Sequence, residues 1–486
     1  MKKKLTNIEV ILVVGTIIKL LGLIYKILLT RILTIEGMRI MSLIFPTLSL
    51  VLCLSSLSIS TVVNQNVAAK LNNSKTILKS AFNITFVSSS VISILLLLSF
   101  PIYKIIYQTS FIYYPLLICI PLVYLSNTSG LLKGYLEANN NFKTTYYSNF
   151  FEQIAKFVLT FSMLFIFANQ SMEFKIFMCF FALMLSEVVS FTYLVIKVKR
   201  KRKINFMEVK TNGYEKSILK QALPLTLDQL VMTITGYFEP LIFYYAIGLQ
   251  GYDLYEATLY YTKVCSYAIP LLVFAHFGVL SIAKFTFPKI TKNRNNPKAL
   301  SAILSKAFFI CIIIAAFNFI ICSFYAAETL NLMYGDSSSA EIATKLAIFY
   351  IFSYFNPIFV IILQAYKEEK KLLISSIVCS ILILTLIFIL TYFYSFTGFL
   401  ISIIVGNITK FLFLFFFANH CVRFKMEWKK LLPLGAVLIL YYLLNFYYRS
   451  VTTLALSTLA CGLLVLLLYF RFFGNKKVYF HGERHK

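Results

Sequence analysis

Long apolar stretches alternate with short polar or basic junctions along the whole chain. The first stretch runs from Ile8 to about Arg31, and similar stretches follow it to the end of the sequence. At roughly 20 residues per crossing, they give about fourteen membrane-spanning helices. The predicted spans are 8–31, 40–66, 80–103, 112–132, 145–168, 174–197, 218–246, 254–283, 301–325, 341–366, 372–393, 396–419, 431–447 and 451–472. The pattern therefore predicts an all-α polytopic membrane protein.

Composition agrees with this class. The chain has 59% hydrophobic and 13% charged residues over 486 positions, and its mean hydropathy is +0.80, far above that of a soluble domain. The nine cysteines show no C-x-x-C spacing and lie mostly inside apolar stretches. We interpret them as packing residues, and we expect no metal site and no cofactor.

The basic residues predict the topology. With the N-terminus inside, nearly every cluster of lysine and arginine falls in a junction on one side of the membrane, as the positive-inside rule requires. This predicts that both termini lie in the cytoplasm and that the protein spans the cell membrane. The net charge of +27 then reflects topology. We expect the basic loops to contact anionic membrane lipids and not nucleic acid.

The run KVKRKRK (197–203) divides the chain. We predict an N-lobe of six helices over 1–197, a basic cytoplasmic linker over 198–216, a C-lobe of six helices over 217–420, and two further helices with a basic tail over 421–486. A faint repeat joins 69–82 to 291–308, including Asn72-Asn73 and Asn295-Asn296, and LLKGY to ILQAY. Two six-helix units of equal orientation are related by a pseudo-two-fold axis along the membrane normal, which is a transporter plan.

The most informative residues are Lys19 and Lys26 in the first span. An ammonium group at mid-membrane costs about 2.5–3.5 kcal/mol even on the mildest scale. Seven residues on a helix return to nearly the same face, so both lysines point the same way. That face is expected to line a cavity that holds an anionic group. Lys263, in the outer half of the eighth span, either faces this cavity as well or reaches the outer interface.

Other charged residues lie within the spans. Glu152 and Lys156 are spaced i,i+4 and are predicted to form a structural ion pair. Asp228 and Glu239 lie close to prolines in the seventh span, which we therefore expect to be broken or bent. These two carboxylates are candidates for a gate or ion site, with a helix-bending device and a satisfied salt bridge as the equal alternative.

The external hairpin after the first span reads LTRILTIEGMRI. Its charged residues Arg31, Glu36 and Arg39 are candidates for the outer rim of the basic surface. The alternative is a short solvated loop with one local ion pair.

Three segments carry a family resemblance: KLLGLIYKILLTRIL (19–33), EGMRIMSLIFPTLSLVLCLSS (36–56) and KGYLEANNNFKTTYYSNFFEQIAKF (133–157). They resemble the stage V sporulation protein B-like flippases, relatives of the lipid II flippase in the multidrug/oligosaccharidyl-lipid/polysaccharide (MOP) exporter superfamily. The chain departs from the family at Thr34 and Arg39, where glycine is usual. It also lacks the Gly-x-Pro that commonly ends the second helix, within 56–70.

The resemblance implies a V-shaped cationic cavity between two lobes. It further implies outward movement of undecaprenyl-pyrophosphate-linked sugars by alternating access, for peptidoglycan, polysaccharide or spore cortex. By motif position, the cavity residues are Lys19, Lys26 and Arg31. Cell-wall synthesis proteins are the partners expected of such a flippase.

Three other functions compete with this one. A cation-coupled multidrug exporter of the same superfamily would want carboxylates where the chain has Lys19 and Lys26. A membrane enzyme would need a long extramembrane region or an Asp-x-Asp motif, and the sequence has neither, so we expect no enzyme. A non-transporting scaffold for cell-wall assembly would gain nothing from buried lysines.

Overall fold

The structure is a computed structural model that describes residues 7–68, 74–99, 101, 111–139, 141–202, 214–422, 428–469 and 471–472. Within these ranges the chain is almost entirely helical, and no strand occurs. The predicted all-α class is therefore confirmed. Asn72 and Asn73 of the predicted repeat lie outside the described residues, whereas Asn296 caps a helix by accepting a bond from the N–H of Ala299 at 3.2 Å.

The described helices include ten that are long and apolar enough to cross a bilayer, and a broken pair, Leu254–Leu272 with His276–Asn293, can supply an eleventh. The two longest are α1 (Asn7–Ser56) and α16 (Glu369–Val422). A straight helix of such length would measure about 75–80 Å, over twice the hydrocarbon core of about 30 Å. Each contains a non-helical break, so each is two spans. The shorter apolar helix in 432–447 supplies one more span. Each of the fourteen predicted spans thus has a counterpart among the described helices.

The break in α1 falls at Thr34, whose backbone has φ 56° and ψ −173°. This conformation is essentially restricted to glycine, and other residues held in it cost about 1–3 kcal/mol. Next to it, a Cβ added to Gly37 would lie 2.7 Å from Cβ of Leu33 and 3.0 Å from Sδ of Met172. The turn therefore requires glycine at position 37. At position 34 the chain has threonine, whose backbone is strained.

The break in α16 falls at Tyr394 and Ser395, and Ser395 has φ 50°. A Cβ on Gly406 would approach Cδ1 of Ile383 to 2.7 Å. Ile383 and Gly406 lie about equally far along the sequence before and after the break. Their close approach therefore shows that the two halves of α16 pack against each other as a hairpin.

The helices form two compact units. The N-terminal unit comprises Met1–Thr262, Met333–Gly335 and Leu384–Phe396, and the C-terminal unit comprises Lys263–Leu332, Asp336–Ile383 and Thr397–Lys486. The division into lobes at residues 198–216 stays a prediction. Residues 203–213 of that linker lie outside the described part, and residues up to Arg202 continue a helix.

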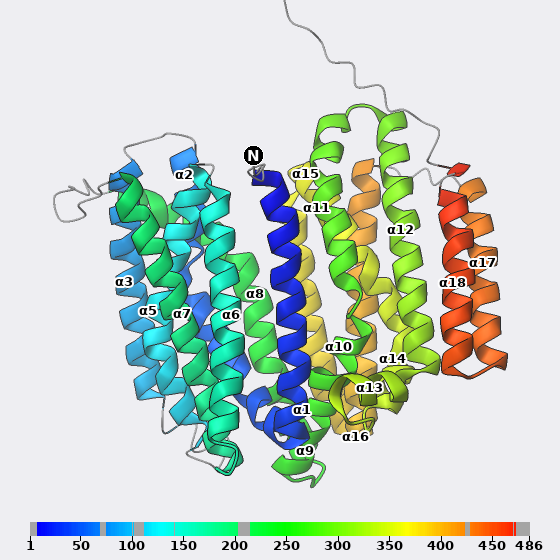
Figure 1. Cartoon of the computed structure of the whole chain (residues 1–486), viewed down its shortest axis with the longest axis horizontal. Coiled ribbons are helices and arrows are strands. Elements are labelled where there is room, and N and C mark those ends of the chain that lie inside the picture. The colour runs from blue at the N-terminus through cyan, green and yellow to red at the C-terminus, as the bar shows by residue number, and fades with distance from the viewer. Residues whose placement is uncertain are drawn as a thin grey trace, which may run out of the picture. The chain divides into compact units, whose positions relative to one another are not determined.

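The described part of the N-terminal unit contains α1 and seven further helices (Figure 1): α2 (Ile59–Ala68), α3 (Ser74–Leu98), α5 (Tyr113–Ala138), α6 (Phe142–Ile166), α7 (Met172–Arg202), α8 (Glu215–Gly248) and α9 (Leu254–Thr262). Aliphatic side chains from α2, α3, α5, α7 and α8 form one of its cores, including Val62, Ile77, Leu131, Leu194 and Ile218. Helix α5 reaches α2 closely at Gly134, where an added Cβ would lie 2.4 Å from the carbonyl oxygen of Ser60.

The C-terminal unit starts with a π-helical turn, η2 (Lys263–Ala268). The elements that follow are α10 (Ile269–Leu272), α11 (His276–Asn293), α12 (Pro297–Phe324), α13 (Ala326–Tyr334), α14 (Ala340–Tyr350), η3 (Ile351–Phe355), α15 (Asn356–Ala365), most of α16, α17 (Trp428–Tyr447) and α18 (Val451–Tyr469). Its core joins α11, α12, α15 and α16 through aromatic and aliphatic side chains. The last two helices pack on α12 through Phe309, Tyr441 and Cys461.

Candidate functional site

The two lysines of the predicted cavity face lie in the first half of α1. Both side chains are exposed in the N-terminal unit, and neither forms an ion pair with another described residue. The same half of α1 packs on α6, where a Cβ on Gly15 would lie 3.2 Å from the ring of Tyr146. The Tyr25 hydroxyl lies 3.4 Å from Oγ1 of Thr160. Packing on α6 thus holds α1 while Lys19 and Lys26 stay free to meet an anion.

The other two predicted cavity residues occupy different environments. Arg31 is exposed near the break of α1. Lys263 is half-buried at the first position of η2. Short π-helical stretches are rare and frequently mark functional positions, so Lys263 remains a candidate. It belongs to the C-terminal unit.

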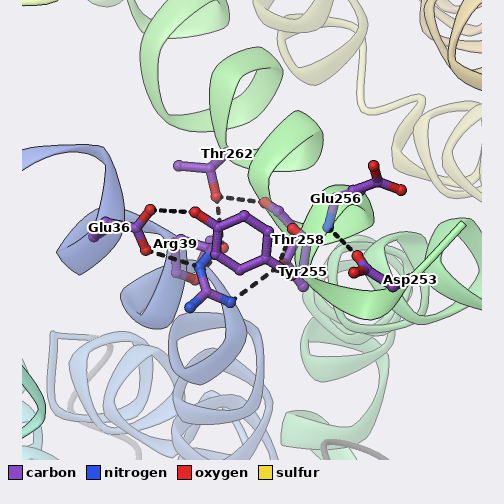
Figure 2. Close-up of polar contacts among 8 residues, drawn as sticks. Glu36, Arg39, Asp253, Tyr255, Glu256, Thr258 and Thr262 are labelled. Atoms are coloured by element: carbon purple, nitrogen blue, oxygen red, sulfur yellow. Dashed lines mark hydrogen bonds and ion pairs between the residues drawn. The ribbon is translucent and has the colours of Figure 1, made fainter.

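The predicted rim residues Glu36 and Arg39 form an ordered network with α9 (Figure 2). Nε of Arg39 lies 3.4 Å from Oε2 of Glu36, and its guanidinium donates to Oγ1 of Thr258 at 3.3 Å. The Tyr255 ring stacks 4.6 Å below the guanidinium carbon, and its hydroxyl donates to Oε1 of Glu36 at 2.6 Å. The hairpin was alternatively expected to be a solvated loop with one local ion pair. It has more than that, because Glu36 and Arg39 both contact side chains of α9.

A second contact extends this network. Oγ of Ser42 lies 3.1 Å from Oγ1 of Thr262, which in turn donates to the carbonyl of Thr258 at 2.8 Å (Figure 2). The second half of α1 is thus tied to α9 by hydroxyl groups that are fully buried or nearly so. The chemistry of this cluster is charge-balanced, so it is suited to fixing α1 and not to binding an anion.

The predicted ion pair between Glu152 and Lys156 is wrong, because each of the two residues contacts a different partner. Oε2 of Glu152 on α6 lies 3.1 Å from Nζ of Lys133 on α5, while Nζ of Lys156 lies 4.6 Å from the ring centroid of Tyr25 on α1. An i,i+4 pair on one helix face is worth only about 0.2–0.5 kcal/mol. Glu152 instead pairs with a partly buried cation on a neighbouring helix, and Lys156 contacts an aromatic ring on another. These contacts form in place of the weak pair within α6.

The seventh span was expected to be broken or bent, and the break is wrong because the helix is continuous. Helix α8 runs from Glu215 to Gly248 through Pro224 and Pro240. Prolines are tolerated within transmembrane helices where neighbouring groups satisfy the freed carbonyls. Glu239 is partly buried on this helix, and the side chain of Asp228 lies outside the described part.

The eighth span is broken instead, after α10. The carbonyl oxygen of Leu272 accepts from Nδ2 of Asn318 and from the hydroxyl of Tyr354, each at 2.8 Å. Nε2 of His276 lies 3.1 Å from the carbonyl oxygen of Ser353. Interrupting a helix within a membrane leaves carbonyls that need donors, and this unit supplies them from two neighbouring elements.

Lys133 lies in a predicted junction, and no sequence pattern marks it as a site residue. A group of buried polar side chains in the N-terminal unit was likewise not predicted. Nδ2 of Asn127 donates to Oγ of Ser55 and of Ser89, each at 3.0 Å. The signal available was the run of three serines, 88–90, in the middle of an apolar span. No group of metal-ligating residues occurs in the part of the chain that the structure describes.

Comparison with known proteins gives a consistent result. Residues 5–281, more than half of the chain, match the family model described as polysaccharide biosynthesis protein. Stage V sporulation protein B of Bacillus subtilis (strain 168) is 24% identical over 395 residues, which cover 78% of this chain and 76% of that protein.

Two solved structures share the fold. The lipid II flippase MurJ in an inward closed conformation has a TM-score of 0.70 and 16% identity, covering 95% of this chain and 98% of that one. An inward-facing multidrug resistance MATE family transporter of the MOP superfamily has a TM-score of 0.68 and 16% identity, covering 84% and 94%. The predicted resemblance to stage V sporulation protein B-like proteins is confirmed, and the two solved structures show that the chain shares their fold. The chain therefore belongs to the polysaccharide biosynthesis protein family, as a multi-pass membrane protein with a transporter fold.

Proposed function

We propose that this protein is a flippase that moves an undecaprenyl-pyrophosphate-linked saccharide outward across the bacterial cell membrane by alternating access. The observation that carries the proposal is the pair of exposed, unpaired lysines on one face of α1, Lys19 and Lys26. A pyrophosphate carries about two negative charges, and ammonium groups in a low-dielectric cavity bind such an anion by charge-assisted hydrogen bonds.

In this proposal, Lys19 and Lys26 recruit the headgroup, with Arg31 of the same unit as a further cationic contact. The prenyl tail stays in lipid while the sugars cross through water. With both termini in the cytoplasm, an inside-negative potential favours outward movement of the anion, by about 2.3 kcal/mol per charge per 100 mV. The likeness to polysaccharide biosynthesis proteins and to a lipid II flippase supports a saccharide precursor as cargo.

The test is binding of undecaprenyl-pyrophosphate disaccharide to the purified full chain, measured by native mass spectrometry. We expect the Lys19→Ala/Lys26→Ala variant to bind at least ten-fold more weakly than the wild type. The control variant Lys216→Ala/Lys220→Ala removes the same charge from two exposed lysines near the start of α8 and should bind normally.

Equal losses of binding affinity in both variants would show that the effect comes from net charge alone. Lys19 and Lys26 would then have no specific role in binding. No binding by the wild type, together with retention of cationic dyes, would favour the multidrug exporter instead.

A further inference from the structure

The N-terminal unit contains a cavity of about 420 Å³, and none of the described residues that line it carries a charged side chain. Five helices contribute to it: α1, α2, α3, α5 and α8. The polar lining residues are Ser49, Ser56, Ser60, Thr85, Ser126, Asn127, Gln229 and Thr233. Its size falls within the range of small-molecule sites, about 300–1,000 Å³.

The chemistry of this lining differs from that of the α1 lysines. Ligand pockets are usually apolar with a few placed polar groups, whereas hydroxyl and amide groups dominate here. Such groups donate and accept hydrogen bonds but hold no net charge. The cavity therefore suits a neutral solute with many hydroxyl groups and does not suit a pyrophosphate.

One buried group in the lining lacks a partner. Thr85 is 2% exposed, and its Oγ1 has no hydrogen bond to any described residue. A buried hydroxyl without a partner costs about 1–3 kcal/mol. Nearby, both Asn127 N–H bonds are directed to Ser55 and Ser89, which fixes the orientation of its amide. Oγ1 of Thr85 has almost no exposed surface, so a bound sugar hydroxyl that displaces the side chains covering it would supply its missing partner.

The backbone at the edge of the cavity is strained. Leu57 and Ser58, between the lining residues Ser56 and Ser60, have φ 46° and 50°. Positive φ at a bulky residue is an outlier, and such strain collects at ligand-binding sites. Oγ of Ser58 also donates to Oε1 of Gln229 on α8 at 3.3 Å. The break between α1 and α2 thereby presents hydroxyl groups to the cavity and joins it to α8.

We propose that this cavity binds the sugar part of the lipid-linked cargo. The inference rests on the proposed function, and it assigns the two chemical parts of one cargo to two places in the N-terminal unit. The anionic pyrophosphate is bound by the α1 lysines and a neutral sugar ring by the hydroxyl and amide groups of the cavity. Sugar hydroxyls match such groups because each can donate and accept.

The experiment measures affinities of the purified full chain for two probes, undecaprenyl pyrophosphate and undecaprenyl-pyrophosphate disaccharide. The test variant Thr85→Val/Gln229→Leu removes polar groups from the cavity while keeping side-chain size. The control Thr145→Val/Gln221→Leu makes the same changes outside it. Thr145 is also 2% exposed with an unpartnered Oγ1, and Gln221 lies on the same helix as Gln229.

We expect the disaccharide to tighten wild-type and control binding at least ten-fold over the bare lipid, and this gain to fall at least five-fold in the test variant. Unchanged binding of the bare lipid by the test variant shows that it is folded. An undiminished gain in the test variant, or no gain in the wild type, overturns the sugar site alone. Binding of neither probe by the wild type overturns the proposed function and this inference with it.

Discussion

The two units of this protein have different interiors. The N-terminal unit buries polar groups at several levels: the Lys133–Glu152 pair, the Asn127 cluster and a hydroxyl-lined cavity. The C-terminal unit is filled largely by aromatic and aliphatic side chains, and Phe359 contacts the rings of Phe308, Phe411 and Phe415. Buried polar groups stabilise little unless they are fully satisfied, so their concentration in one unit supports the proposal that the cargo is recognised there.

The largest effect is expected in the aromatic core. Replacing Phe359, which is 2% exposed, with alanine should lower the free energy of unfolding by about 3–5 kcal/mol, because it removes buried surface and leaves a cavity. Thermal unfolding in detergent measures the loss. The control Phe416→Ala changes a ring that is 62% exposed in the same unit and should have little effect. A loss below 1 kcal/mol at Phe359 would contradict the tight packing of this unit.

A smaller effect is expected from the ion pair of the N-terminal unit. Lys133→Met should lower the free energy of unfolding by about 1.5–3 kcal/mol, because it leaves Glu152 partly buried without its cation. Adding Glu152→Gln should recover part of the loss. If the double variant is as unstable as the sum of the two single variants, the residues do not act as a pair.

The strained turn of α1 gives an effect of opposite sign. Thr34→Gly should raise the free energy of unfolding by about 1 kcal/mol, since glycine adopts φ 56° without the cost paid by threonine. Thr30→Gly, at a helical and buried threonine of the same helix, is the control and should destabilise. Unfolding curves that coincide for wild type and Thr34→Gly would show that the break carries no strain.

The smallest effect is expected where the C-terminal unit caps its broken helix. Asn318→Leu removes one of two donors to the carbonyl of Leu272 and should cost roughly 0.5–1.5 kcal/mol, the net value of one hydrogen bond. Adding Tyr354→Phe should cost more than the sum of the single changes, because the carbonyl is then left without a donor. Additive losses would show that each bond stabilises independently.

Much of the fold followed from the sequence because hydrophobic length and basic junctions are strong signals. All the spans were found, and the resemblance indicated relatives of stage V sporulation protein B, which the comparison with known proteins also found. Thr34 was noted as a departure from a usual glycine, and the structure shows why glycine suits that position. Local spacing was less informative: the prolines near Asp228 and Glu239 predicted a break in α8 that is absent.

The site was harder to predict, because side-chain partners come from helices distant in sequence. Glu152 and Lys156 are four residues apart, yet each finds its partner on another helix. The partners of Arg39 on α9 lie more than 200 positions away and have no local signature. The hydroxyl-lined cavity depends on serines and threonines, which also occur in ordinary transmembrane packing, so no single residue marks it.

The carbonyl oxygen of Leu272 accepts two hydrogen bonds, and this affects which substitutions the protein can tolerate during evolution. A carbonyl with one donor makes that donor indispensable, whereas two donors from separate elements, Asn318 and Tyr354, are redundant. Either residue can change while the other keeps the broken helix satisfied. Homologous sequences should therefore vary at one of these positions at a time, and the break itself can outlast the identity of the residues that support it.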